Sequence, residues 1–255
     1  MGLAGIYFGL RGRFGLSGLM FGLSFLCKEL AVLMFLPMLI YLVVQKTGKW
    51  KLVFFGGVAF VVAFFGVWLF DLVYQPVIGG VGVVNPVQNF MIMAVYQFKL
   101  NGLRNATGSK WAAWYPPISW VSPFGANAFN PLKWIWLSVG NKVYYSFMLQ
   151  PNAGVEYLMF PLLVLLPVAY WVRREGVALL CWLLLVFTFL PWFIVGFFVR
   201  TEANFYLAAS IPFLCVGSAY LYTFIKNRKL KYALALTQLA VAILWFVIYF
   251  PIPIL

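Results

Sequence analysis

Lys28 and Glu29 are adjacent charged residues inside the otherwise apolar run from Phe14 to Tyr41. A charged side chain at the centre of a membrane helix costs roughly 2.5 to 3.5 kcal/mol on insertion scales, so such residues usually face a protein interior or a polar cavity. The pair is therefore a candidate substrate-binding site. The coupling pair of a transporter is an alternative, although the chain shows no inverted repeat.

Arg200, Glu202 and Tyr206 form a second candidate site, at the start of the predicted helix RTEANFYLAASIPFL. A helix N-terminus attracts anions, and a guanidinium group binds phosphate oxygens in two-pronged fashion. Tyr206 lies four residues after Glu202, on the same face of the helix. The group predicts a phosphate-binding site, and a simple ion pair between Arg200 and Glu202 at the membrane interface is the alternative.

Membrane helices are the elements that must position these residues. The 255 residues are 65% hydrophobic and only 9% charged, whereas a soluble domain has about 45 to 50% apolar and about 25% charged residues. Apolar runs of nearly 20 residues recur along the chain, which is the length needed to cross a bilayer as a helix. The composition predicts an all-α integral membrane protein.

Basic residues set the predicted topology. The formal net charge is +13, and most of the basic residues lie in short clusters between apolar runs. Such clusters mark cytoplasmic loops and have anionic membrane lipid as their partner. No recognition motif accompanies the charge, so nucleic acid is not predicted as a partner. The clusters are Arg11 and Arg13, Lys46 to Lys51, Arg173 and Arg174, and Lys226 to Lys231.

Residues 14–44 lie between the first two clusters and are predicted to fold as a short hairpin, with Lys28 and Glu29 at its tip. One long tilted helix over the same residues is the alternative. With the hairpin, every later basic loop is cytoplasmic. The chain is then a polytopic helical bundle of six to seven membrane segments in the plasma membrane or the endoplasmic reticulum.

Three regions follow from this pattern. Residues 1–74 hold the N-terminal membrane helices, including the hairpin and a spanning helix from Leu52 to Tyr74. Asp71 lies near the outer end of that helix, where it either reaches the interface or has a function. Residues 75–154, rich in glycine, proline and aromatic residues, are predicted to form one large extracytoplasmic loop domain. Residues 155–255 hold four closing segments: Val155 to Val172, Val177 to Phe198, Ala203 to Ile225 and Tyr232 to Phe250.

The loop region contributes three further candidates. Trp114 lies in SKWAAWYPPISW, whose indoles either anchor the loop at the interface or form a wall for a sugar or lipid headgroup. Asn105 begins the sequon Asn-Ala-Thr, a potential glycosylation site. Asn85 begins the passage NPVQNFMIM. Histidine is absent, and the three cysteines lie apart in apolar segments; no cofactor is predicted, and metal dependence is left open.

Four passages, taken in order, resemble the dolichyl-phosphate-mannose–protein mannosyltransferases and related GT-C membrane glycosyltransferases. The first is LRGRFGLSGLMFGLSFLCKEL, through Gly18, Gly22, Leu23 and Lys28. The second is NPVQNFMIM, through Asn85, Pro86 and Met93, with Asn89 where a histidine is common. The third is SKWAAWYPPISW, through Ser109, Trp111 and Trp114. The fourth is RTEANFYLAASIPF, through Arg200, Tyr206 and Pro212.

The resemblance implies transfer of a sugar, such as mannose, from a polyprenyl-phosphate donor on the extracytoplasmic face to a protein or lipid acceptor. Lys28, Glu29, Asn85, Trp114, Arg200, Glu202 and Tyr206 would then bind substrate. Members of this family carry their catalytic acid in a first outer loop that has no counterpart in this chain. The chain is therefore expected to correspond to the later part of such an enzyme, incomplete alone, with a partner chain supplying that loop. A non-catalytic membrane subunit that packs in a larger complex is the alternative.

Overall fold

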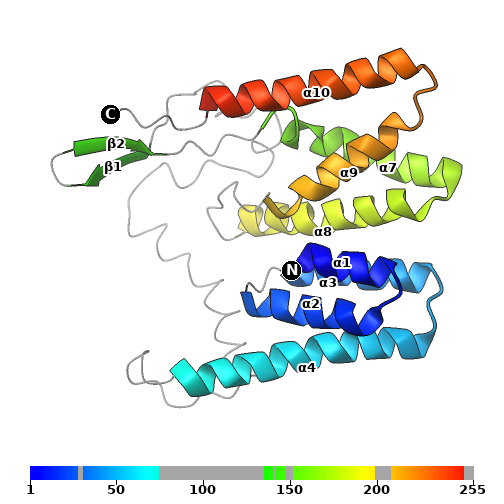
Figure 1. The fold of residues 1–255 in the computed structure, drawn as a ribbon, viewed down its shortest axis with the longest axis vertical. Coiled ribbons are helices and arrows are strands. Elements are labelled where there is room, and N and C mark those ends of the chain that lie inside the picture. Colours follow the sequence, from blue (N-terminus) through cyan, green and yellow to red (C-terminus); the bar gives the residue numbers. More distant parts are fainter. Residues whose placement is uncertain (28–30, 75–134, 140–141, 147–151, 199–207, 250–255) are drawn as a thin grey trace. The chain divides into compact units, whose positions relative to one another are not determined.

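The computed structural model describes residues 1–27, 31–74, 135–139, 142–146, 152–198 and 208–249 (Figure 1). The chain divides into two compact units, Met1–Ala106 and Thr107–Leu255, which are treated separately below as unit 1 and unit 2. Eight α-helices, one short 3-10 helix and one β-hairpin make up the described part. The predicted loop domain, 75–154, lies almost wholly outside it.

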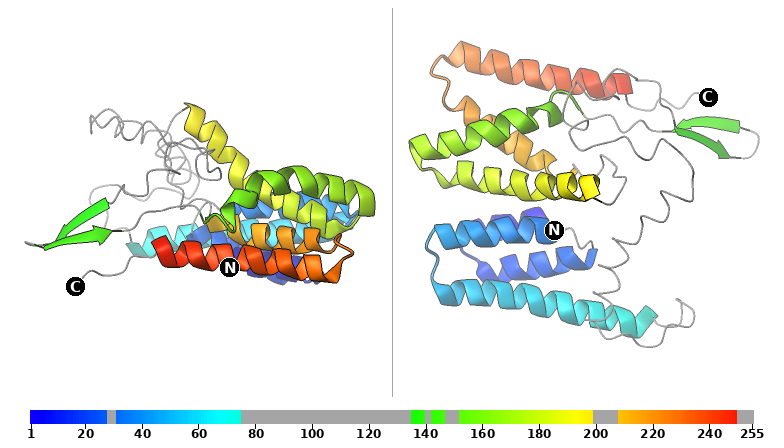
Figure 2. Two further views of the ribbon diagram at one scale, coloured as in Figure 1. Left: turned by 90° about the horizontal axis from the view of Figure 1, so that it is seen from above. Right: turned by 180° about the vertical axis from the view of Figure 1, so that it is seen from behind.

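Unit 1 consists of four helices that lie side by side in Figures 1 and 2. A turn of three residues, Arg11 to Arg13, joins the first two helices, and its Gly12 has φ +71°, in the left-handed region that glycine adopts freely. The helices are α1 (Gly2–Leu10), α2 (Phe14–Cys27), α3 (Val32–Val44) and α4 (Lys49–Tyr74).

Phe21 of α2 and Phe35 of α3 show that residues 14–44 are not one helix. Their ring centroids lie 5.6 Å apart, whereas fourteen residues of continuous α-helix would separate them by about 21 Å along its axis. The predicted helical hairpin is confirmed, and the alternative of a single long helix is wrong. Phe55 of α4 completes an aromatic core, with its ring 5.8 Å from Phe21 and 5.0 Å from Phe35.

Glycines let α1 pack closely on α2 and α3. A Cβ atom at Gly5 would lie 2.8 Å from the Phe21 ring, and one at Gly9 would lie 2.4 Å from the Met38 methyl group. The buried Ser17 hydroxyl of α2 donates a hydrogen bond of 2.6 Å to the Gly5 carbonyl. Small residues spaced four apart and hydroxyl groups that bond a neighbouring helix are both typical of helix contacts in membranes.

Unit 2 is built on three apolar helices, with a fourth attached to them. Leu162, Leu166, Leu184 and Leu214 are almost completely buried, and they come from the first three of these helices. The elements of the unit are the strands β1 (Ile135–Val139) and β2 (Lys142–Ser146), the 3-10 helix η4 (Glu156–Leu158), and the helices α7 (Met159–Arg173), α8 (Gly176–Phe198), α9 (Ile211–Tyr222) and α10 (Arg228–Tyr249).

The β-hairpin corrects the all-α prediction. β1 and β2 pair antiparallel, with Leu137 opposite Tyr144 and Val139 opposite Lys142. The strands are rich in the β-branched and aromatic residues that favour strands, and Gly140 and Asn141 stand between them. Among the described residues, the all-α prediction holds for the apolar segments, and this hairpin within the predicted loop region is the exception.

The third of the four predicted closing segments, Ala203 to Ile225, is not one α-helix. Residues 208–210 form a 3-10 turn, and α9 begins only at Ile211. Pro212 explains this start, because proline lacks an N–H and fits the first turn of a helix but breaks its interior. The other predicted helices begin and end within about four residues of the observed ones.

Three stretches of the described helices are long and apolar enough to cross a membrane: Lys49–Leu69, Glu156–Arg173 and Arg228–Val247. Four more are apolar but shorter: Phe14–Cys27, Val32–Val44, Gly176–Trp192 and Ile211–Tyr222. These helices support the prediction of an integral membrane protein. The number of six to seven membrane segments stays a prediction.

Candidate functional site

The residues predicted to bind substrate all lie outside the described part of the chain. This holds for Lys28, Glu29, Asn85, Trp114, Arg200, Glu202 and Tyr206, and for the sequon at Asn105. Asp71 lies in the last turn of α4. The structure therefore bears on the candidate site through the helices that flank these residues.

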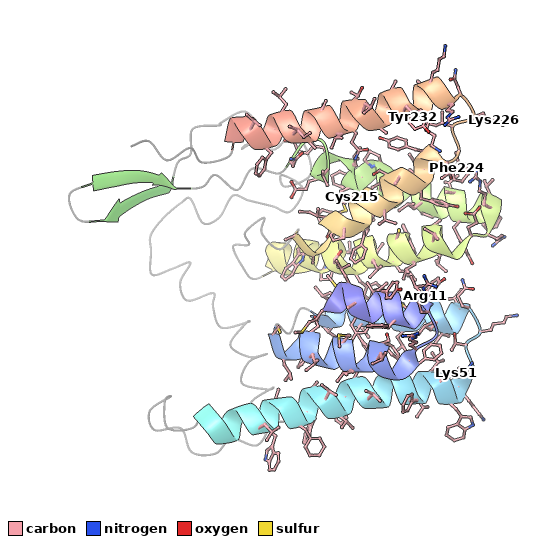
Figure 3. The ribbon with its side chains drawn as sticks, viewed as in Figure 1. Arg11, Lys51, Cys215, Phe224, Lys226 and Tyr232 are labelled. Carbon is pink, nitrogen blue, oxygen red and sulfur yellow. The ribbon has the colours of Figure 1, made fainter. Side chains whose placement is uncertain are left out.

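In unit 1, the basic turns gather at one end of the four helices. Arg11 and Arg13 lie in the turn between α1 and α2, and Lys46 and Lys49 flank the turn between α3 and α4. Figure 3 shows Arg11 and Lys51 at this end, which we call the basic end of unit 1. Because α2 and α4 run away from the basic end and α3 runs toward it, residues 28–30 and residue 75 adjoin helix ends at the opposite, far end.

Unit 2 repeats this arrangement. Its basic end carries Arg173 and Arg174 between α7 and α8, and Lys226 to Lys231 around the start of α10. Arg173 ties the two turns together: its guanidinium donates to the Thr223 hydroxyl at 2.9 Å and to the Thr223 carbonyl at 3.4 Å, and lies 3.6 Å from the centroid of the Phe224 ring. A cation at the last carbonyl groups of a helix is electrostatically favourable, so Arg173 caps α9.

The far end of unit 2 is where α8 ends and α9 begins. Residues 199–207, which include Arg200, connect these two helices. Thr188 of α8 and Ser210, both completely buried, hold them together through a hydroxyl–hydroxyl contact of 2.8 Å. Thr188 donates its only hydroxyl proton to the Leu184 carbonyl at 2.6 Å, so Ser210 must be the donor to Thr188.

Aromatic residues accompany the cations at both basic ends. Lys49 lies 5.8 Å from the Trp50 ring centroid in unit 1, and Arg174 lies 4.8 Å from that of Trp171 in unit 2. Trp50 is 76% exposed and Trp171 73% exposed. Exposed tryptophan beside lysine and arginine is typical of a membrane–water interface.

An apolar groove of about 380 Å³ lies within unit 1, between α2, α3 and α4. Among the described residues, its lining consists of phenylalanine, valine, alanine and glycine. Gly56 and Ala63 leave it open, and the rings of Phe25, Phe35, Phe60 and Phe64 form much of its walls. Along α4 the groove extends from Gly56 to Val67, about 16 Å at the rise of an α-helix. We call it the α2–α4 groove.

Helix packing accounts for two of the residues that carry the first family-like passage. A Cβ atom at Gly18 would lie 2.5 Å from the Phe55 carbonyl oxygen of α4, and one at Gly22 would lie 2.6 Å from the Val62 Cβ. Glycine is needed at both positions for α2 to approach α4, whatever the function. The pattern Gly-x-x-x-Gly has this role in many membrane helices.

Glu156 is a residue that the sequence reasoning missed. It is the buried acid of the described residues, 9% exposed, and lies at the far end of unit 2. The Asn152 backbone N–H donates to its carboxylate, and the Asn152 side chain donates to the Ala242 carbonyl of α10 at 3.0 Å. An acid at the start of an apolar run, VEYLMF, was the available signal. Asn152 thus links Glu156, in the turn before α7, to α10.

No cluster of three or more histidine, cysteine, aspartate or glutamate side chains that could hold a metal occurs among the described residues. Cys27, Cys181 and Cys215 are free thiols. The groups available in the described part are therefore hydroxyls, amides, single carboxylates and cations, which bind and orient polar ligands.

Comparisons with protein-family models, with curated proteins and with solved structures give no match. The likeness to membrane glycosyltransferases accordingly depends on the sequence passages alone, and activity, substrate and partners are argued as proposals below.

Proposed function

We propose that the chain is the later part of a GT-C-like glycosyltransferase that transfers a sugar from a polyprenyl-phosphate donor to a protein or lipid acceptor on the extracytoplasmic face. Arg200 would bind the donor phosphate, and Lys28 and Glu29 would support the cavity next to it. Asn85, Trp114, Glu202 and Tyr206 would complete the binding surface. The catalytic acid would come from a partner segment.

The observation that supports this proposal is the direction of the helices. In each unit the basic turns are at one end, and the positive-inside rule assigns that end to the cytoplasm. The helix ends that adjoin residues 28–30, residue 75 and residues 199–207 are then extracytoplasmic in both units. The candidate residues from Lys28 to Tyr206 are thus expected on one side of the membrane.

Chemistry on that side needs a phosphate ligand and a base. Arginine binds phosphate oxygens through two parallel N–H groups, so Arg200 is the residue proposed to hold the donor phosphate. A base must accept the proton of the acceptor hydroxyl. Glu29, Asp71 and Glu202 are acids that the sequence assigns to the extracytoplasmic side, and none stands where the resembled family has its catalytic acid.

Transfer can be tested in liposomes that contain the full chain together with a candidate upstream segment. The donor would be a synthetic polyprenyl-phosphate mannose with a radiolabelled sugar, and the acceptor a serine- and threonine-rich peptide. We expect Arg200→Ala to lower the rate by at least about tenfold, since a charged hydrogen-bonding group contributes about 1.5 to 3 kcal/mol. Arg174→Ala, at the basic end, is the matched control and should keep the parental rate. If no upstream segment restored sugar transfer, the proposal that the chain is part of a glycosyltransferase would be refuted.

The alternative is a non-catalytic membrane subunit, and α10 is the observation that favours it. No residue in the apolar window of Arg228–Val247 is buried, although the helix is rich in bulky apolar side chains such as Leu236 and Phe246. A partner helix in a larger complex would cover such a surface. Co-purification of a fixed partner, together with full function after Arg200→Ala, would decide for this alternative.

A further inference from the structure

We propose that the α2–α4 groove of unit 1 binds one acyl chain of a membrane phospholipid. The inference does not depend on the proposed glycosyl transfer, because it concerns a site for a bilayer component and not for a substrate. It follows from the lining, the size and the length of the groove.

The lining of the groove restricts the ligand to a hydrocarbon. No polar side chain is among the described lining residues, which are all phenylalanine, valine, alanine or glycine. A polar ligand would lose its hydrogen bonds to water in such a place, whereas an apolar chain gains by leaving water or by packing against the rings. The α4 residues of the groove are part of Lys49–Leu69, a stretch long enough to span a membrane. Lipid acyl chains are the hydrocarbon that surrounds such a helix.

The volume of the groove fits one chain and not a helix. About 380 Å³ holds about thirteen groups of about 30 Å³ each, the volume of a water molecule and nearly that of a methylene group. A helix 10 Å wide and 16 Å long would need about 1,250 Å³. A partner helix therefore cannot enter the groove, although one could lie across its mouth.

The length of the groove favours a phospholipid over a polyprenyl carrier. Thirteen methylene groups in an extended chain, at about 1.2 Å per bond, are about 16 Å long, which is also the length of the groove along α4 from Gly56 to Val67. Half of a 30 Å hydrocarbon core is about 15 Å. An acyl chain that occupies one leaflet matches this length, whereas a polyprenyl chain would leave most of its isoprene units outside.

Two adjacent glycines of α4 provide a matched pair of variants. A Cβ atom at Gly56 or at Gly57 would meet nothing within 4 Å, so a larger side chain fits at either position. Gly56 lines the groove, whereas Gly57 does not line it and is exposed. Gly56→Phe should therefore fill one end of the groove, and Gly57→Phe should place the same ring on another face of the same helix. Ala63→Leu fills the groove at a second position, in case Gly56→Phe fails to fold.

The test uses the full chain in bilayers that contain a phosphatidylcholine with a diazirine at the middle of one acyl chain. After irradiation, mass spectrometry locates the adducts. We expect adducts on the groove residues Phe25, Phe35 and Phe64 to exceed those on Val61 and Phe65, which are exposed on α4. Gly56→Phe should lower groove labelling by about tenfold, the factor for roughly two lost methylene contacts. Gly57→Phe should leave it unchanged.

Three results would overturn the proposal. Equal labelling of groove and exposed positions, unchanged in Gly56→Phe and Ala63→Leu, would mean that the groove selects no lipid. Labelling by a diazirine polyprenyl phosphate that displaces the phospholipid probe would assign the groove to the carrier. Absence of groove labelling by both probes in folded protein would mean that another part of the protein covers it. None of these depends on whether sugar transfer is observed.

Discussion

Replacement of Gly18 by alanine tests the close approach of α2 and α4, on which the architecture of unit 1 depends. The added Cβ would lie 2.5 Å from the Phe55 carbonyl oxygen and 3.2 Å from the Ala59 backbone nitrogen, whereas ordinary contacts begin at 3.4 Å. Because the nearest atom belongs to the backbone, no change of rotamer can relieve the contact. The two helices would have to move apart by nearly 1 Å.

The size of the effect follows from two opposing contributions. Overpacking in a well-packed interior costs typically about 1 to 3 kcal/mol, and the better helix propensity of alanine offsets at most about 1 kcal/mol. Gly18→Ala is therefore expected to lower the free energy of unfolding by about 1 to 2 kcal/mol. Gly57→Ala, where a Cβ meets nothing within 4 Å, should be neutral or raise it by up to about 1 kcal/mol.

Equilibrium unfolding of the purified chain in mixed micelles with increasing dodecyl sulfate, followed by circular dichroism, would compare the two variants with the parent. From the highest to the lowest dodecyl sulfate concentration at the midpoint of unfolding, the expected order is Gly57→Ala, parent, Gly18→Ala. If Gly18→Ala matched Gly57→Ala, α2 and α4 would not approach as closely as described. The glycines of the first family-like passage would then need another explanation, and a functional one would gain weight.

Three further predictions concern unit 2 and the topology. Arg173→Ala should lower the free energy of unfolding by about 1 kcal/mol, because a partly exposed arginine loses its bonds to Thr223 and its contact with Phe224. The control, Arg174→Ala, should change it by less than about 0.5 kcal/mol. Equal effects of the two variants would contradict the capping of α9. Thr188→Val should cost about 1 to 3 kcal/mol in the same unfolding assay, because it leaves the buried Ser210 hydroxyl without its acceptor; if adding Ser210→Ala gave strictly additive losses, the two residues would not be coupled. In a chain whose native cysteines are replaced by serine, Gly48→Cys and Lys226→Cys should both react with an impermeant maleimide from the cytoplasmic side only, and reaction of either from the outside would refute the common basic ends.

The helices were predictable because apolar runs and basic clusters are strong local signals. The run from Leu52 to Tyr74 has a single charged residue, Asp71 near its end, and the observed α4 begins three residues earlier and ends at the same residue. The hairpin of residues 14–44 followed from charge alone, since both flanking clusters had to lie on one side. The start of α9 was misjudged because Pro212 was used as a family match and not as a residue that favours the first turn of a helix.

Other features depend on contacts that sequence spacing does not specify. The strands at 135–139 and 142–146 were missed because residues 75–154 were interpreted as one loop domain, although Gly140 and Asn141 between two runs rich in β-branched and aromatic residues are a hairpin signal. Glu156 was overlooked because it lies at the margin of an apolar segment, and only the fold shows that Asn152, which donates to its carboxylate, also bonds Ala242 of α10. The groove could not be foreseen, because its lining residues, such as Phe25, Phe35 and Gly56, belong to three different helices and face one space only in the folded unit.

The unequal lengths of the unit 1 helices have a consequence for the bilayer itself. α2 and α3 have 14 and 13 residues, about 21 and 20 Å of helix, whereas the neighbouring α4 has 26 residues, about 39 Å. A membrane with a 30 Å core cannot match both, so we expect lipids to compress beside α2 and α3 while α4 projects beyond them. At fractions of a kcal/mol per Å, this hydrophobic mismatch of about 10 Å amounts to several kcal/mol. Unit 1 would then create a local dimple in the leaflet at the far end of α2 and α3, which shortens the path from water to the chain between these two helices.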